Sequence, residues 1–78
     1  MDWKKAKIPS GGRLFKVHNF TFMRKGVTYH LEVDEYNDGA FTGHGEHSTD
    51  KNLMIESVSA TSVTECLEAL MSKIDKRG

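Results

Sequence analysis

Hydrophobic and polar residues alternate with a period of two through much of the first half of the chain. In the first alternating run Phe20 and Phe22 alternate with Asn19, Thr21 and Met23, and a second run extends over residues 27–34. Because successive side chains of a strand point to opposite faces, the pattern predicts two half-buried antiparallel strands joined by a turn. The register that keeps the apolar side chains on one face places Phe20 opposite Leu31 and Phe22 opposite Tyr29.

A second turn is predicted at residues 37–39, where the sequence reads Asn-Asp-Gly. Asparagine and aspartate suit a type I turn, and glycine adopts the left-handed conformation that follows, so we expect a three-residue hairpin loop with a bulge. This loop length sets the next register, with Glu32 facing His44 and with Phe41 on the apolar face. A two-residue loop would instead turn Phe41 toward the polar face.

Two glycines, Gly43 and Gly45, fall on the apolar face of the third predicted strand. A glycine inside a strand commonly marks a place where another segment approaches the backbone closely, and a helix is the expected occupant. Further along the chain, residues 48–52 predict a polar loop, and residues 53–58 predict a short fourth strand.

After residue 60 the hydrophobic period changes to that of an amphipathic α-helix. Ser62 is followed three residues later by Glu65, a pattern typical of a capping box. The predicted fold is therefore α+β, a four-stranded antiparallel meander with one C-terminal helix packed on one face (ββββα). The apolar stripe of the helix consists of Val63, Cys66, Leu67, Leu70, Met71 and Ile74. Cys66, the lone cysteine, is interpreted as a small buried hydrophobe.

The length of 78 residues corresponds to a single domain. Residues 9–12 read Pro-Ser-Gly-Gly and form a linker-like stretch, so residues 1–12 are predicted to be a basic N-terminal arm and residues 13–78 the α+β domain. The composition, 37% hydrophobic and 28% charged, excludes wholesale disorder, and a single cysteine excludes an internal disulfide. The absence of a recognisable signal peptide or membrane-spanning stretch predicts a cytoplasmic protein without a membrane partner.

The 11 basic and 11 acidic residues cancel in total, but they are segregated along the chain. Residues 1–26 hold seven bases and one acid, and residues 27–56 hold seven acids and one base. Either the basic first third lies beside the acidic middle of its own fold, or a basic arm is offered to nucleic acid or to an acidic partner. Bases interleaved with aromatic residues support the second interpretation, and its candidate nucleic-acid-binding residues are Trp3, Lys4, Lys5, Lys7, Arg13 and Lys16.

Histidines and glutamates gather on the polar face of the predicted sheet. Two imidazoles and two carboxylates on adjacent strands can bind a zinc-like ion or share a proton. The alternative interpretation is a solvated polar face without a ligand, and no other cofactor is predicted. The candidate metal ligands are His30, Glu32, His44 and Glu46.

Recognisable catalytic motifs are missing from the sequence. None of the serines has the context of a nucleophile elbow, and residues 10–12 lack the frame of a phosphate-binding loop. We therefore expect a protein without enzymatic activity.

The order of features over residues 29–74 resembles the HicB-like antitoxin domain. The matching segments are a strand at residues 29–33, a D-G hairpin turn at residues 37–41 and a helix start at residues 62–67. The family's proline- and glycine-containing segment after the second matched strand is replaced here by residues 43–47, and no toxin-contact or DNA-binding residue can be carried over. The resemblance implies an interaction module that works by binding another protein.

These features together predict a small non-catalytic cytosolic protein that acts as a protein-interaction module through an exposed sheet edge or helix flank. Its partner is either another protein or a second copy of itself. The two alternatives are a nucleic-acid-binding protein that uses the basic arm and a metal-binding site on the outer face of the sheet.

Overall fold

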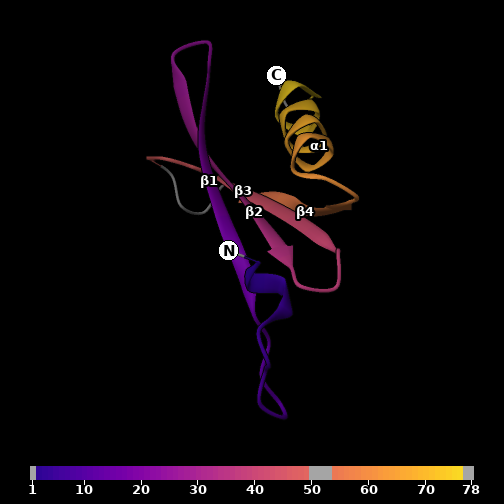
Figure 1. The fold of residues 1–78 in the computed structure, drawn as a ribbon. Coiled ribbons are helices and arrows are strands. Elements are labelled where there is room, and N and C mark those ends of the chain that lie inside the picture. The colour runs from indigo at the N-terminus through magenta and orange to yellow at the C-terminus, as the bar shows by residue number, and fades with distance from the viewer. Residues whose placement is uncertain (1, 50–53, 77–78) are drawn as a thin grey trace.

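The computed structural model describes residues 2–49 and 54–76. Four strands form one antiparallel sheet in the order β1-β2-β3-β4, and a helix lies across one of its faces (Figure 1). The predicted ββββα fold is therefore confirmed. The elements in chain order are the 3-10 helix η1 (Trp3–Lys5), β1 (Phe15–Arg24), β2 (Val27–Tyr36), β3 (Phe41–His47), β4 (Met54–Ala60) and α1 (Val63–Lys76).

Strand β4 ends later than the sequence predicts. It continues to Ala60, which pairs with Phe41 of β3. Residue 53, the predicted start of this strand, and residues 50–52 of the predicted loop lie outside the described residues. The prediction stopped early because residues 59 and 60, Ser and Ala, carry little hydrophobic signal, whereas pairing with β3 holds their backbone in the strand.

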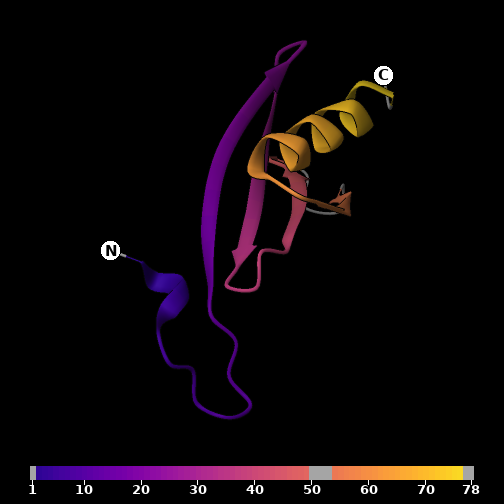
Figure 2. The same ribbon diagram turned by 45° about the vertical axis from the view of Figure 1, so that its right-hand side comes forward.

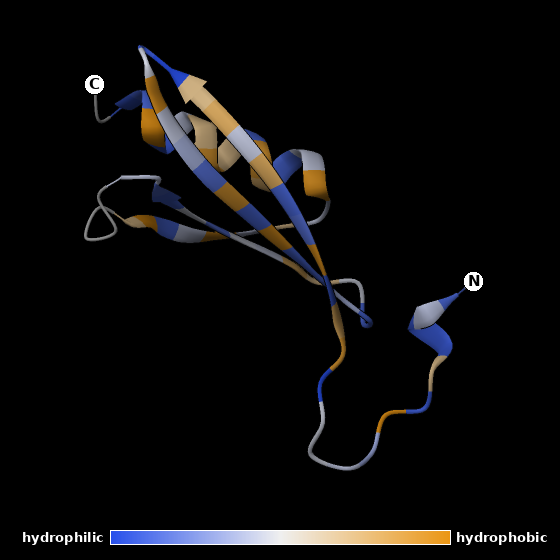
Figure 3. Ribbon diagram, turned by 90° about the vertical axis from the view of Figure 1, so that its left-hand side faces the viewer, coloured by the Kyte–Doolittle hydropathy of each residue, from blue (hydrophilic) through white to orange (hydrophobic). Residues whose placement is uncertain are grey.

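The predicted registers of both hairpins are confirmed. Phe20 pairs with Leu31, and Glu32 pairs with His44. The second hairpin has the expected three-residue loop, because the Tyr36 N–H donates to the Ala40 carbonyl at 2.9 Å. The hydropathy of β1 and β2 alternates visibly along the long hairpin (Figure 3).

The first hairpin turn determines which backbone groups of β1 face away from the sheet. Lys25 and Gly26 have φ angles of 53° and 79°, as in the type I′ turn that suits a two-residue hairpin loop. The flanking residues Arg24 and Val27 then form a hydrogen-bonded pair, and such pairs recur at every second residue. The even-numbered residues of β1 therefore bond to β2, and the N–H and C=O groups of its odd-numbered residues point away.

Helix α1 packs on β4, β3 and β2. A Cβ at Gly43 would lie 3.1 Å from Leu70 Cδ1 and 3.3 Å from Cys66 Cβ, so the predicted close approach of the helix holds there. At Gly45 the expectation is wrong, because the nearest neighbour is Leu31 Cδ2 at 2.9 Å, a residue of the sheet itself. The buried hydrophobic core comprises Leu31, Val33, Ile55, Cys66, Leu70 and Ile74.

At the start of α1, Ser62 caps the helix as predicted, but the Glu65 side chain bonds to Thr61. The Glu65 N–H donates to Ser62 Oγ at 3.1 Å, as expected of an N-cap serine. The Glu65 carboxylate accepts a hydrogen bond from Thr61 Oγ1 at 2.7 Å. Cys66, a residue of α1 that faces the sheet, is fully buried, and this burial raises the pKa of its thiol.

The molecule is elongated for a chain of its size. Its radius of gyration is 14.1 Å, whereas a compact domain of this length has roughly 11.5 Å. The extra length comes from the β1–β2 hairpin and from the segment between η1 and β1, which runs away from the sheet and returns (Figure 2). A large part of the chain therefore lies outside the small core under α1.

Candidate functional site

The face of the sheet opposite α1 carries a shallow hollow of about 430 Å³. All four residues predicted as metal ligands line it: His30, Glu32, His44 and Glu46. They are gathered because odd and even positions of a strand alternate between faces, and because the observed registers pair His30 with Glu46 and Glu32 with His44.

The tightest cluster on this face consists of Glu32, Asp34 and His44. One possible ligand atom from each side chain lies within 4.8 Å of those of the other two. Glu32 Oε2 and His44 Nε2 are 3.1 Å apart. Of the four predicted ligands, Glu32 and His44 belong to this cluster, whereas His30 and Glu46 line the same hollow outside it. Metal binding by the set of four stays a prediction.

Asp34 is the member of the cluster that the sequence analysis missed. It is only 7% exposed, although it lies on the outer face of the sheet between Val17 and Thr42 of the neighbouring strands. Its Oδ1 atom is buried without a hydrogen-bond partner in the described part of the chain. The available signal was its position two residues after Glu32, which places both carboxylates on one face.

Burial and the neighbouring Asp34 carboxylate set the electrostatics of Glu32. Burial raises the pKa of Glu32, and the contact with Asp34 raises it further, whereas the nearby His44 acts in the opposite direction. Two carboxylates so close together require a proton or a cation between them.

A β-bulge lies beside His44. Gly43 pairs with Val58 and Gly45 pairs with Ile55, so two residues of β4, Glu56 and Ser57, face the single residue His44. A bulge of this kind bends the strand and re-aims neighbouring side chains, and bulges are frequent next to functional sites.

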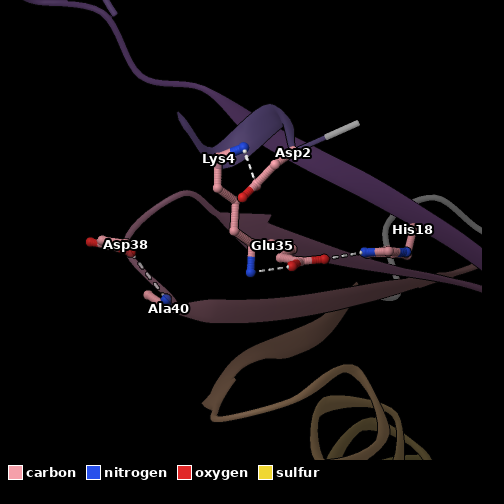
Figure 4. A network of polar contacts seen from close by, with 6 residues as sticks. All are labelled: Asp2, Lys4, His18, Glu35, Asp38 and Ala40. Atoms are coloured by element: carbon pink, nitrogen blue, oxygen red, sulfur yellow. Dashed lines mark hydrogen bonds and ion pairs between the residues drawn. The ribbon is translucent and has the colours of Figure 1, made fainter. Parts of the chain in front are cut away.

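The N-terminal arm is tied to the sheet through Glu35. Lys4 Nζ lies 2.8 Å from Glu35 Oε2, and His18 Nε2 lies 2.9 Å from Glu35 Oε1 (Figure 4). These hydrogen bonds, first from Lys4 and then from His18, lower the pKa of Glu35. The pairing of the basic first third with the acidic middle is thus present at this contact, and His18, a residue without a predicted role, takes part in it.

The six residues predicted to bind nucleic acid are distributed over both faces of the sheet. Lys4 reaches Glu35, whereas Arg13 stacks on Tyr36 with its guanidinium carbon 4.5 Å from the ring centroid. Glu35 and Tyr36 are consecutive strand residues and therefore point to opposite faces. Lys5 lies 3.9 Å from Asp2, while Trp3 lies in η1 and Lys7 and Lys16 are exposed. Nucleic-acid binding by these residues stays a prediction.

Strand β1 forms an edge of the sheet, and its apolar side chains are exposed on both faces. Phe15 is 41% exposed and Val17 is 42% exposed on the outer face, and Phe20 is 38% exposed on the face that carries α1. The exposure on the helix face arises because α1 packs on the other three strands.

Arg24, at the tip of the hairpin, is joined to the helix by an ion pair of 2.6 Å with Asp75.

Within residues 2–49 and 54–76 we find no helix with the length and hydropathy needed to cross a membrane. Comparison of the chain with protein-family models, with curated proteins and with solved structures gives no match. The resemblance to the HicB-like domain stays a prediction, and the function has to be argued from the geometry.

Proposed function

We propose that this protein is a non-catalytic cytoplasmic interaction module that pairs with a second copy of itself through the free edge of β1. The observation that carries the proposal is the exposure of this ten-residue edge strand on both faces. A long edge strand with exposed apolar side chains readily accepts another strand, because its outward backbone groups are available for pairing.

The backbone geometry of β1 supports this mode of association. The hairpin turn at Lys25 and Gly26 directs the N–H and C=O groups of odd-numbered residues outward. A second strand added at this edge bonds to those residues and leaves the β1–β2 ladder intact. The groups available for pairing belong to Phe15, Val17, Asn19, Thr21 and Met23.

Charge distinguishes two neighbouring registers for two antiparallel copies of β1. A twofold axis at Asn19 places Lys16 opposite the partner's Phe22 and His18 opposite the partner's Phe20. An axis at Phe20 would instead place Lys16 opposite the partner's Arg24, and like charges directly opposite each other are unfavourable. We therefore propose the register centred on Asn19.

The small core also favours association. The chain has an elongated shape, with a radius of gyration of 14.1 Å, and exposed phenylalanines lie beside the core. Pairing two copies continues the sheet and covers Phe20 with the partner's side chains, which adds buried apolar area that one small domain lacks. The resemblance to the HicB-like domain points to the same class of function, binding to a protein.

The test is sedimentation equilibrium of the purified chain and of two variants at the proposed axis. The wild type is expected to form a dimer of twice 8.8 kDa. Asn19→Lys and Asn19→Asp each place two like charges opposite each other, which costs about 1 kcal/mol and raises the dimer dissociation constant about fivefold.

Mixing the two variants in equal amounts creates a Lys–Asp pair at the axis and is expected to restore association. Ser59→Lys makes the same charge change at an exposed position of β4, the opposite edge of the sheet from β1, and serves as the matched control. A monomeric wild type, or a dimer that responds to Ser59→Lys and not to the Asn19 variants, contradicts the proposal.

A further inference from the structure

Asp34 has an unusual position for a carboxylate. The side chain is more than nine-tenths buried, and Oδ1 is without a hydrogen-bond partner in the described part of the chain. Burial of a charged group is costly unless the charge is paired or coordinates a metal ion. The position therefore calls for a partner of positive charge.

Three basic side chains of the sheet, the arm and the helix contact groups other than Asp34. Arg13 stacks on the ring of Tyr36, and Lys4 pairs with Glu35 on the opposite face of the sheet. Lys73 pairs with Glu56 at 3.1 Å. Among the described residues, no ion pair to Asp34 is formed.

We propose that Glu32, Asp34 and His44 bind a divalent transition-metal ion, for which Zn²⁺ is the reference. The inference rests on the close cluster of three ligand atoms and on the buried Oδ1 atom of Asp34, a member of that cluster, which has no hydrogen-bond partner among the described residues. It is independent of the proposed self-association.

The spacing of the cluster suits such an ion. Ligand atoms of tetrahedral Zn²⁺ lie about 2.0 to 2.2 Å from the metal and hence about 3.3 to 3.6 Å from one another. Glu32 Oε2 and His44 Nε2 are already 3.1 Å apart, and the remaining separations are below 4.8 Å. Small rotations of the side chains therefore bring all three ligands to the metal.

The donor set determines the class of ion. One imidazole nitrogen and two carboxylate oxygens suit Zn²⁺, Mn²⁺ and related ions, whereas Ca²⁺ prefers six to eight oxygen ligands. Three protein ligands leave the remaining coordination positions to water or to a small ligand. Those positions face the hollow, since Glu32 and His44 both line it.

The test is isothermal titration of the full chain, without added histidines, with ZnCl₂ and in parallel with CaCl₂. One Zn²⁺ per chain is expected to bind, and Ca²⁺ is expected to bind at least about tenfold more weakly. Asp34→Asn, Glu32→Gln and His44→Gln are each expected to weaken Zn²⁺ binding at least about tenfold. Glu68→Gln removes the same charge from an exposed position of α1, across the sheet from the hollow, so it is the matched control and is expected to leave the affinity within about twofold.

Thermal melts distinguish a metal site from a shared proton and detect variants that fail to fold. In EDTA, Asp34→Asn is expected to melt at or above the temperature of the wild type, because the variant lacks the unpaired buried charge. Added Zn²⁺ is expected to raise the melting temperature of the wild type and not that of Asp34→Asn. Absence of binding to the wild type, equal weakening by Glu68→Gln, or equal Zn²⁺ stabilisation of both chains overturns the proposal.

Discussion

Lys4 Nζ lies 2.8 Å from Glu35 Oε2, so the first helical turn of the chain is joined to the second strand of the sheet. Glu35 Oε1 also accepts a hydrogen bond from His18 Nε2 at 2.9 Å, and the Glu35 side chain is 16% exposed. One carboxylate thus holds both the arm and the edge strand β1. The position of the arm depends on this contact more than on its apolar residues, because η1 contains no buried residue.

Lys4→Gln is expected to release η1 from the sheet. Without the charged hydrogen bond to Glu35, Trp3 becomes more exposed to water, and its fluorescence emission shifts to longer wavelength. Lys5→Gln is the matched control, because Lys5 is largely exposed and pairs with Asp2 within the same turn. Equal emission spectra for wild type and Lys4→Gln would show that η1 is held by other contacts.

Stability is expected to fall in acid through Glu35. The folded state lowers the pKa of this carboxyl below its ordinary value of 4.5. A lowered folded-state pKa adds stability that is present above pH 4.5 and is lost as pH falls through the folded-state pKa. Urea denaturation of wild type and Glu35→Gln measures this directly: the difference in stability between the two chains should shrink as pH falls below 4.5. A constant difference across this range contradicts the assignment.

Gly43→Ala is expected to destabilise the protein by about 1 to 3 kcal/mol through overpacking. The added methyl group meets Leu70 at 3.1 Å, Val58 at 3.2 Å and Cys66 at 3.3 Å at once. A double-mutant cycle with Leu70→Ala should be non-additive by about 1 kcal/mol, because the shortened side chain makes room for the methyl group. Additive free energies of unfolding would mean that the helix does not approach β3 at this residue.

Proline substitutions test which backbone groups of β1 face outward. Val17→Pro removes an outward N–H, so the fold is expected to persist while the dimer dissociates. His18→Pro removes an N–H bonded to β2, and the loss of this ladder hydrogen bond is expected to destabilise the fold by about 1 to 3 kcal/mol. Circular dichroism melts and sedimentation of the two variants separate these effects. The reverse pattern would indicate that even-numbered residues form the free edge.

The hairpins were predictable from the sequence because their turns fix the pairing. The alternation around Phe20 and the Asn-Asp-Gly loop each allow one register that keeps apolar residues together, and both registers are observed. The close packing at Gly43 followed from the same registers. These features are local, or they follow from local features by simple geometry.

The remaining features depend on packing that a sequence pattern does not contain. Asp34 falls on a polar position of the alternating run 27–34, a pattern that predicts exposure, yet it is only 7% exposed. The sequence pattern predicts that the helix approaches Gly45 closely, but Leu31 of the neighbouring strand fills the space beside this glycine. The pairing of Lys4 with Glu35 joins residues far apart in the chain, and segregated charge alone does not specify which pairs form.

The most direct measurement of self-association through β1 is an isotope-filtered NOE experiment on a mixture of labelled and unlabelled chains. In the proposed register His18 and the partner's Phe20 form a non-hydrogen-bonded pair, in which the two Hα atoms approach closely. An intermolecular NOE between the Hα of His18 and the Hα of Phe20 is the predicted result. Intermolecular NOEs confined to β4 or α1, or none at concentrations where sedimentation detects a dimer, would contradict the account.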